Sequence, residues 1–297
     1  MPVTSHVTFS SNGHAITSIF RHPGDPGSAR VPCIVINHGY SGFKEEYDDL
    51  AAALNAAGYA TLQFDSRGCG GSDAPLGRMM CSTEWVEDSH AAVTWAAGQP
   101  GVDRGRVGFT GCSLGGVMAL HAAAHDRRVR SVVEMSAFSD GFALLEEVWT
   151  ARRGPEAWRG FLEELERDAM RVVNGERSRM ISVPDALAML EVDRDDYMDD
   201  RRGKPGIVTE VPLESVRSGI LDFRPLLWLD RISVPVMVMH GTSDTIVPPA
   251  HATIIHGALN CTKELVMVKD APHPLPLYDG RAQVFAHVVR WFDSTLA

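Results

Sequence analysis

The chain has 297 residues and a formal net charge of −10. Its length can bury a full core and suits one large α/β domain with an insertion. The acidic balance argues against a nucleic-acid partner and against an anionic membrane surface, because either partner would require a basic stripe on the protein.

The five cysteines are scattered, odd in number and without a C-x-x-C spacing. We therefore expect neither a disulfide framework nor a zinc site, and a reducing, cytoplasmic setting fits best. The N-terminal residues lack a basic segment followed by an apolar one, and no run of 18 apolar residues occurs. A signal peptide and a membrane-spanning segment are accordingly not expected.

The first half of the chain alternates predicted strands with predicted helices. Residues 3–9 and 15–22 flank a turn and predict an N-terminal hairpin. Strands are predicted for the apolar runs 33–37, 60–64, 107–110 and 129–135, and the first of these runs suits a strand covered on both faces. Helical spacing occurs between them, at 45–57, 83–97 and 116–123. This alternation predicts right-handed crossovers and a parallel sheet.

The alternation breaks between residues 139 and 224, where the chain is charged and helix-prone. We interpret 139–224 as a helical cap inserted into a core domain that comprises 1–138 and 225–297. The strand pattern resumes at 234–239 and 264–268, and an apolar helix follows at 282–292. The predicted fold class is thus α/β, with a mostly parallel central sheet flanked by helices and an inserted helical cap. The last helix can pack inside a monomer or contribute to a homo-oligomer.

Residues 107–117 have the pattern of a nucleophile elbow, in which a strand turns sharply into a helix. The turn reads G-C-S-L-G at 111–115, and a helix of small residues follows at once. A serine in so tight a turn has strained backbone geometry, and glycines two residues away on either side leave room for it. Ser113 is therefore the candidate nucleophile. The five-residue motif is common by chance, so its context has to decide.

A serine hydroxyl needs a neighbouring base at neutral pH, and that base needs an acid to orient it. Asp244 follows one predicted strand and His273 follows the next. All three residues thus lie at carboxyl ends of strands, where open α/β sheets bind their ligands. The order and placement favour Ser113, Asp244 and His273 as a catalytic triad.

Several motifs together resemble the α/β-hydrolase superfamily of serine hydrolases, over nearly the whole chain. They are H-G-Y (38–40), F-D-S-R-G-C-G-G-S (64–72), G-C-S-L-G-G (111–116), H-G-T-S-D-T-I-V-P (240–248) and the loop of His273. Within the superfamily they resemble feruloyl and cinnamoyl esterases on one side, and cocaine-esterase and X-Pro dipeptidyl-peptidase relatives on the other.

The resemblance implies an acyl-enzyme formed on Ser113, with His273 taking and returning the proton and Asp244 fixing the tautomer of the imidazole. It also implies an oxyanion hole built from the backbone N–H of Leu114 and from Tyr40. Tyr40 can donate through its own N–H or through its hydroxyl, and the sequence does not choose between them.

Other polar residues near these motifs have plainer interpretations. If His273 were an ordinary loop histidine, His251 or His256 would be the base, but both lie in a predicted helix. Asp65 and Arg67 suit an ion pair or a clamp that holds their loop. These residues are therefore not expected to take part in the chemistry.

Cysteine and metal chemistry are also weighed against the motifs. Cys112, beside the elbow, suits a small buried filler better than a nucleophile. His121 and His125 share a helix face, as zinc ligands can, but the glutamate of H-E-x-x-H is missing. We expect no metal and no cofactor.

These features favour hydrolysis of a carboxylic ester, a thioester or an activated amide of a small to medium acyl substrate. A short-peptide peptidase, a lactonase and an acyltransferase are alternatives on the same fold, and a scaffold without chemistry is disfavoured by the complete triad. The cap supplies large side chains for packing and for an acyl pocket, namely Phe142, Trp149, Trp158, Phe161, Met170, Met180, Met189, Tyr197 and Met198.

Overall fold

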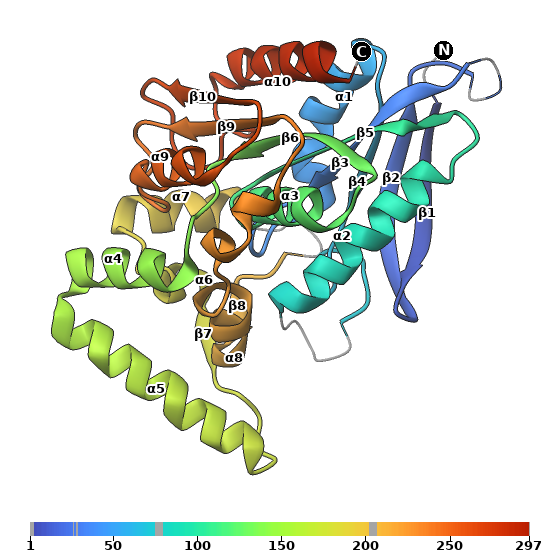
Figure 1. Ribbon diagram of the computed structural model, residues 1–297. Helices are drawn as coiled ribbons and strands as arrows, with labels where there is room; N and C mark the ends of the chain where they lie inside the picture. Colours follow the sequence, from blue (N-terminus) through green and yellow to red (C-terminus); the bar gives the residue numbers. More distant parts are fainter. Residues whose placement is uncertain (1–2, 26, 28, 75–79, 202–206, 297) are drawn as a thin grey trace.

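A computed structural model describes residues 3–25, 27, 29–74, 80–201 and 207–296, with the side chains of 196 and 198–201 left out. Its centre is a sheet of eight strands in the order β1-β2-β4-β3-β5-β6-β9-β10 (Figure 1). The strands are β1 (Val3–Ser11), β2 (His14–His22), β3 (Val31–Asn37), β4 (Ala60–Phe64), β5 (Val102–Cys112), β6 (Val129–Met135), β9 (Val236–Gly241) and β10 (Lys263–Val268).

The six strands from β4 to β10 in this order are parallel, and only β1 and β2 run antiparallel to their neighbours. The predicted hairpin and parallel sheet are confirmed. Strand β5 is longer than predicted, since it begins at Val102, which pairs with Val31 ahead of a shift in register. The sequence did not predict this part of the strand, because residues 103–106 (D-R-G-R) interrupt the apolar run.

Helices cover both faces of the sheet (Figure 1). On one face lie α1 (Asp48–Ala56) and α10 (Arg281–Thr295), and on the other lie α2 (Ser82–Ala97), α3 (Leu114–His125) and α9 (Ala250–Ala258). The predicted helix 45–57 starts as a 3-10 turn, η1 (Lys44–Tyr47), before α1 begins. Each face therefore has its own apolar core, which explains why the central strands are apolar on both sides.

Residues 139–224 connect β6 to β9 through helical elements and one small sheet. The helices are α4 (Gly141–Arg153), α5 (Pro155–Val173), α6 (Val183–Ala186), α7 (Glu191–Arg201), α8 (Leu213–Val216) and the π-helical turn η2 (Arg217–Leu221). The sheet pairs β7 (Met180–Ser182) with β8 (Glu210–Pro212). The sequence did not predict these strands, because three residues are too few for an alternating pattern.

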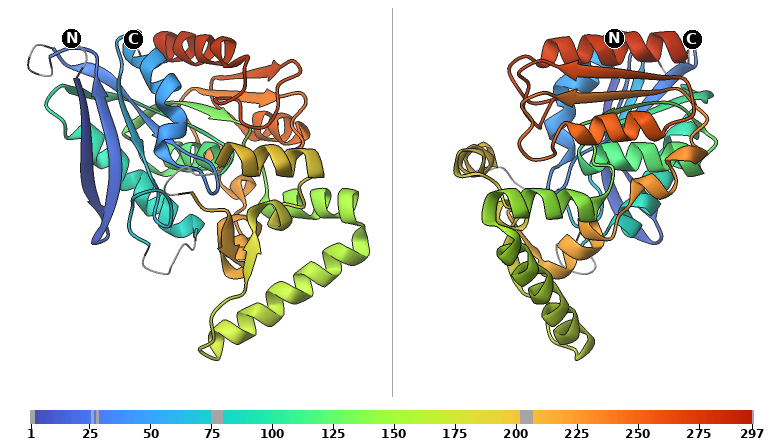
Figure 2. Two further views of the ribbon diagram at one scale, coloured as in Figure 1. Left: turned by 180° about the vertical axis from the view of Figure 1, so that it is seen from behind. Right: turned by 60° about the vertical axis from the view of Figure 1, so that its left-hand side comes forward.

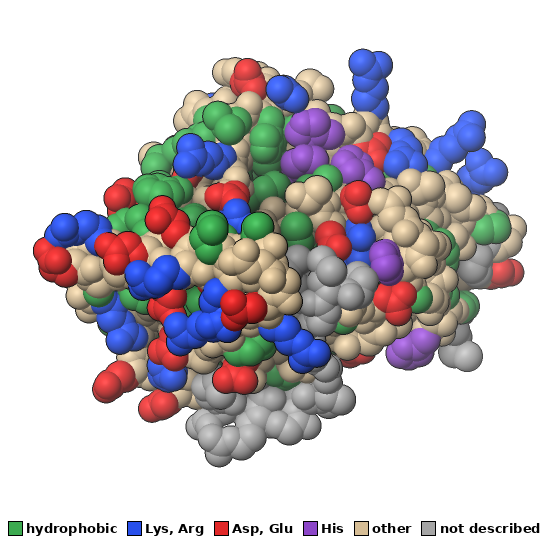
Figure 3. Space-filling view, turned by 90° about the horizontal axis from the view of Figure 1, so that it is seen from below, with side chains coloured by type: hydrophobic (Ala, Val, Ile, Leu, Met, Phe, Trp, Pro, Cys, Tyr) green, Lys and Arg blue, Asp and Glu red, His purple; other side chains and the backbone are tan. Residues whose placement is uncertain are grey.

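Helix α5 projects from the rest of the molecule as an arm (Figure 2). Acidic and basic side chains intermingle over this part of the surface (Figure 3). Short-range ion pairs such as Arg159–Glu156 and Arg167–Glu163 account for this mixture. Part of the charge that marked 139–224 in the sequence thus lies on the solvated outer face of α5.

Two short 3-10 turns, η3 (Pro225–Leu227) and η4 (Leu229–Arg231), lead from this segment to β9. Whether 139–224 forms a domain of its own stays a prediction.

Among the described residues, none of the helices combines the length and the apolar character needed to cross a membrane.

Candidate active site

Ser113 stands between the end of β5 and the first residue of α3. Its backbone angles are φ 58° and ψ −125°, a conformation that costs a non-glycine residue on the order of 1–3 kcal/mol. The surrounding sheet holds it there, since the Ser113 N–H donates to the Met135 carbonyl at 2.8 Å. The strain is thus supported by the fold, as the elbow pattern predicts.

Glycines on both sides of Ser113 are required by close backbone contacts. A Cβ at Gly115 would stand 2.3 Å from the Asn37 carbonyl oxygen, and a Cβ at Gly111 would stand 2.5 Å from the Gly115 carbonyl. Neither contact can be relieved by moving a side chain, because the opposing atoms belong to the backbone. The glycines therefore let α3 start directly against the end of β3.

Asp244 and His273 meet beside this elbow. His273 Nδ1 lies 2.8 Å from Asp244 Oδ2, while Asp244 Oδ1 accepts the N–H groups of Ile246 at 2.9 Å and Val247 at 2.8 Å. Burial opposes the charge of Asp244, but His273 and the other donors outweigh it and hold the pKa of this carboxyl well below its usual range. Asp244 is accordingly a buried carboxylate oriented toward His273.

Ser113 and His273 line one cavity of about 340 Å³. Tyr40 also lines it, so the predicted nucleophile, base and oxyanion-loop residue open onto the same space. A volume of this size is at the lower end of those that hold small-molecule ligands. The structure therefore brings together residues that lie up to 233 positions apart in the sequence.

The segment 139–224 supplies part of the cavity wall, through Val183, Leu187, Met189, Asp193 and Tyr197. Of the large side chains that the sequence offered in this segment, Met189 and Tyr197 thus line the cavity. The sequence did not single out Val183, Leu187 and Asp193, because neither their size nor their spacing distinguishes them from residues that pack elsewhere.

The other large side chains of the segment have different places. Trp149 and Phe161 stack at 4.2 Å between ring centroids, and Phe142 packs against Trp158. Met170 and Met180 are exposed. The side chain of Met198 lies outside the described residues.

Tyr40 and Leu114 approach Ser113 from two directions. Leu114 is the first residue of α3, so its N–H has no acceptor within the helix. The backbone before Tyr40 lies against the serine, since a Cβ at Gly39 would stand 3.4 Å from Ser113 Cβ. The Tyr40 ring packs on Gly219 of η2, where a Cβ would stand 3.1 Å from ring Cε2, and burial raises the pKa of the phenol. The backbone of Tyr40 is therefore beside Ser113.

The family model described as the alpha/beta hydrolase fold matches residues 32–279, which is most of the chain. The chain belongs to this family. An uncharacterized 31.7 kDa protein from Escherichia coli is 30% identical over the full length of both chains. The acyltransferase drtE of Aspergillus calidoustus is 26% identical over 82% of this chain and 80% of its own.

A solved structure shows the same fold. Est1E of Butyrivibrio proteoclasticus, determined with bound ferulic acid, has a TM-score of 0.68 and 20% identity, and the match covers 98% of this chain and 99% of that one. The predicted fold class and the resemblance to α/β-hydrolases are thereby confirmed. Fold and relatives together support a hydrolase-type activity for this α/β-hydrolase.

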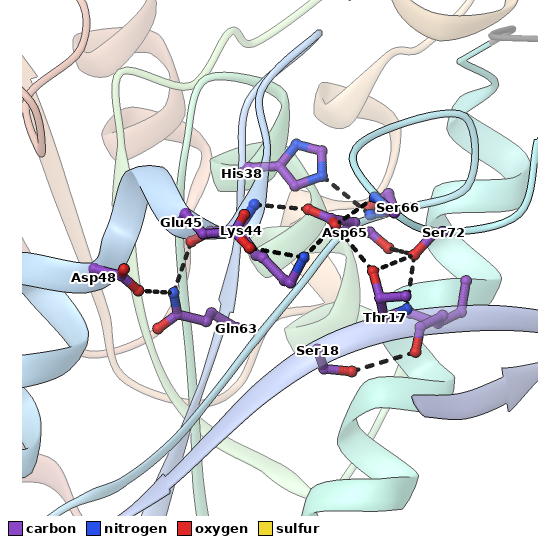
Figure 4. A network of polar contacts seen from close by, with 12 residues as sticks. Thr17, Ser18, His38, Lys44, Glu45, Asp48, Gln63, Asp65, Ser66 and Ser72 are labelled. Carbon is purple, nitrogen blue, oxygen red and sulfur yellow. Dashed lines mark hydrogen bonds and ion pairs between the residues drawn. The ribbon is translucent and has the colours of Figure 1, made fainter. Parts of the chain in front are cut away.

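Asp65 ties together three separate parts of the α/β-hydrolase core (Figure 4). Its buried carboxylate accepts hydrogen bonds from Lys44 N and Lys44 Nζ, both at 2.7 Å, from Gly71 N at 2.9 Å and from Thr17 Oγ1 at 3.0 Å. Lys44 follows Tyr40 by four residues. Asp65 therefore anchors the loop whose other end lies against the elbow.

Arg67 forms a second clamp of its own. It donates to Asp88 through its backbone N–H and its Nε, both at 2.8 Å, and to Glu87 at 2.6 Å. The expectation of a loop clamp thus holds for both Asp65 and Arg67, but they act through different partners and do not pair with each other.

The alternative bases lie away from the cavity of this α/β-hydrolase. His251 and His256 are both on α9, and neither lines the cavity. His251 Nδ1 accepts the Ser139 N–H at 3.1 Å, and burial lowers the pKa of His251 to about 4. The geometry therefore favours His273 over both as the partner of Asp244.

Cys112 is buried at the end of β5, where burial raises the pKa of its thiol well above the usual value. This shift disfavours the thiolate that a cysteine nucleophile needs. His121 and His125 stack at 4.1 Å between ring centroids, and burial lowers the pKa of His121 to about 3. Within the described ranges, no group of three or more candidate ligands is arranged to hold a metal ion.

Proposed function

We propose that this α/β-hydrolase cleaves a carboxylic ester, a thioester or an activated amide through an acyl-enzyme on Ser113, without a cofactor. One observation carries the proposal: a serine held at a positive φ opens onto the same cavity as a histidine whose Nδ1 is bonded to a buried aspartate. This combination matches the roles of nucleophile, base and orienting acid.

In the proposed reaction, Ser113 Oγ attacks the acyl carbonyl carbon while His273 Nε2 takes the hydroxyl proton. The tetrahedral intermediate collapses when the bond to the leaving atom breaks, which is oxygen in an ester, sulfur in a thioester and nitrogen in an amide, and His273 gives the proton to that atom. A water molecule then attacks the acyl-enzyme, gives its proton to His273 and releases the acid, after which His273 returns the proton to Ser113. Asp244 stabilises the imidazolium at each step without taking the proton.

The charge that develops on the carbonyl oxygen requires donors that are already in place. We assign this role to the backbone N–H groups of Leu114 and Tyr40. The burial of the Tyr40 ring against Gly219 and the contact of the Gly39 backbone with Ser113 favour the N–H of Tyr40 over its hydroxyl.

The cavity favours an acyl group of small to medium size. Its volume is about 340 Å³, and Val183, Leu187 and Met189 give it an apolar wall. The ferulic acid bound to Est1E, a protein of the same fold, belongs to the size class proposed here.

Labelling with a fluorophosphonate tests the nucleophile. Wild type should be labelled at Ser113, and Ser113→Ala should not, because the reagent needs an activated serine. Ser136→Ala is a matched control that should still be labelled, since Ser136 also has a positive φ, of 50°, but is fully buried and does not line the cavity. A folded wild-type protein that resists labelling would refute the proposal.

Acyl transfer to an acceptor other than water is the second candidate, and the identity with the acyltransferase drtE over most of both chains favours it. Both reactions share the acyl-enzyme and differ only in what attacks it. With an aryl ester and increasing amounts of an alcohol or amine, a transferase forms the transfer product at millimolar acceptor, whereas a hydrolase continues to release free acid. The product ratio, measured by mass spectrometry, separates the two.

A further inference from the structure

A second histidine contacts the carboxylate that orients His273. His240, near the end of β9, is fully buried, and its Nε2 lies 3.0 Å from Asp244 Oδ2 and 2.9 Å from the Val247 carbonyl oxygen. A carbonyl oxygen can only accept, so Nε2 carries the hydrogen. His240 therefore directs an N–H toward both oxygens.

Both histidines use the same oxygen of the acid. His273 Nδ1 is 2.8 Å from Oδ2, which is also the oxygen that His240 approaches, and the other oxygen is taken by two backbone N–H groups. Two donors on one oxygen share its negative charge, so each hydrogen bond is weaker than it would be alone. The strength of the contact between Asp244 and His273 thus depends on His240.

Glu134 on the neighbouring strand β6 is a second acid whose charge acts on His240. Glu134 pairs in register with Val238, which lies two residues before His240. The side chains of Glu134 and His240 therefore point to the same face of the sheet. Within the described residues, neither Glu134 Oε1 nor His240 Nδ1 has a hydrogen-bond partner. Burial disfavours the charged form of His240, but Asp244 outweighs burial, and together with Glu134 it raises the pKa of this histidine.

The remaining titratable and charged groups around the pair come from other elements. They include His251 on α9, Arg152 on α4 and the Cys112 thiol on β5, and on the cavity side of His273 the carboxyl groups of Glu46 on η1 and Asp193 on α7. His251 is bonded to Ser139, and Arg152 donates to the Ala188 carbonyl at 3.0 Å. Only His240 and His273 donate from a side chain to Asp244 among the described residues.

We propose that His240 is a positioning residue for the reaction proposed above. Its Nε2–H holds the Asp244 carboxylate in place and draws negative charge from the oxygen that both histidines contact. Asp244 therefore stabilises the His273 imidazolium less than it would without His240. This inference rests on the proposed function. It predicts that loss of the His240 donor both slows the reaction and moves the pH at which His273 becomes an effective base.

Two amide variants separate the donor from the volume of the ring. The amide nitrogen of His240→Gln stands near the position of Nε2 and still reaches Asp244, whereas the shorter side chain of His240→Asn does not. Both side chains are uncharged at all pH values. The measurement is kcat/KM against pH with an ester substrate, together with kcat and KM separately.

His240→Asn should lose about tenfold or more in kcat with little change in KM, since an outer residue that orients a reacting group has an effect of this order. In this variant, the ascending limb of the kcat/KM profile should move to higher pH by about half a unit. Asp244 then has one side-chain donor fewer, so it stabilises the His273 imidazolium more. His240→Gln should keep kcat within about threefold of wild type and the limb near its original position. If His240→Asn does not fold, His240→Leu replaces it with the same expectation.

His251→Gln is the control, because His251 is buried to a similar extent but contacts Ser139 and not Asp244. It should leave the limb in place. If the Gln and Asn variants of His240 behave alike, or if the limb does not move in a folded variant that lacks the donor, the inference about His240 is wrong. Fluorophosphonate labelling of wild type, measured in parallel, shows separately whether the proposed function stands.

Discussion

Glu134 lies on β6 with its carboxyl group fully buried, and its Oε2 accepts only one described hydrogen bond, from Ala137 N. Burial raises the pKa of this group to about 7 from an ordinary value near 4.5. The folded protein therefore binds this proton more tightly than the unfolded chain. The stability that results is fully present below pH 4.5 and is lost as the pH rises through about 7.

Glu134→Gln should remove this dependence, because the amide is neutral at every pH. The difference in free energy of unfolding between the variant and wild type should therefore shift in favour of the variant from pH 5 to pH 8, by an amount on the order of 3 kcal/mol. Urea unfolding at both pH values measures the gain. Glu166→Gln, at an exposed position of α5, is the matched control and should not reproduce it. The expectation is contradicted if the free energies of unfolding of Glu134→Gln and wild type differ by the same amount at pH 5 and at pH 8.

Single residues differ in how far the sequence can place them. The motif around Ser113 and the strand ends before Asp244 and His273 were sufficient to predict that Asp244 and His273 pair beside the cavity of Ser113, because strand ends of a parallel sheet share one edge. His240 lies four residues before Asp244 in the same motif, yet nothing in the pattern tells which ring nitrogen faces the acid. That contact depends on the path of the loop after β9, which the structure supplies.

At the scale of elements, the start of α3 depends on a backbone contact with β3. Gly115→Ala should destabilise the protein by about 2 kcal/mol or more, because its Cβ would press on the Asn37 carbonyl. Gly160→Ala is the matched substitution inside α5, where nothing lies within 4 Å of the added carbon. It should stabilise by up to about 1 kcal/mol through helix propensity. Thermal unfolding of both variants tests whether the first substitution lowers the stability and the second raises it.

If Gly115→Ala were as stable as wild type, the tight contact between α3 and β3 would not be a requirement of the fold. Elements also differ in how far the sequence predicts them. The buried central strands are continuous apolar runs and were found within a few residues, whereas the three-residue strands β7 and β8 depend on pairing across residues 183–209 and leave no local signal.

At the scale of the whole molecule, the alternation of strands and helices was sufficient to predict a parallel sheet with helices on both faces. The walls of the cavity were harder to predict. Val183, Leu187 and Asp193 face the cavity only because α6 and α7 fold back onto the core, and helix orientation of this kind is set by packing far along the chain.

The cavity is lined both by loops at the ends of the sheet strands and by the segment 139–224. Ser113, Asp244 and His273 come from the ends of sheet strands, whereas five lining residues come from the segment 139–224. If the proposed function holds, substitutions of these five residues should change which acyl groups fit the cavity, because none of the three proposed catalytic residues belongs to the segment. Under the proposed function, exchange of this one stretch would change the range of accepted substrates without replacing Ser113, Asp244 or His273.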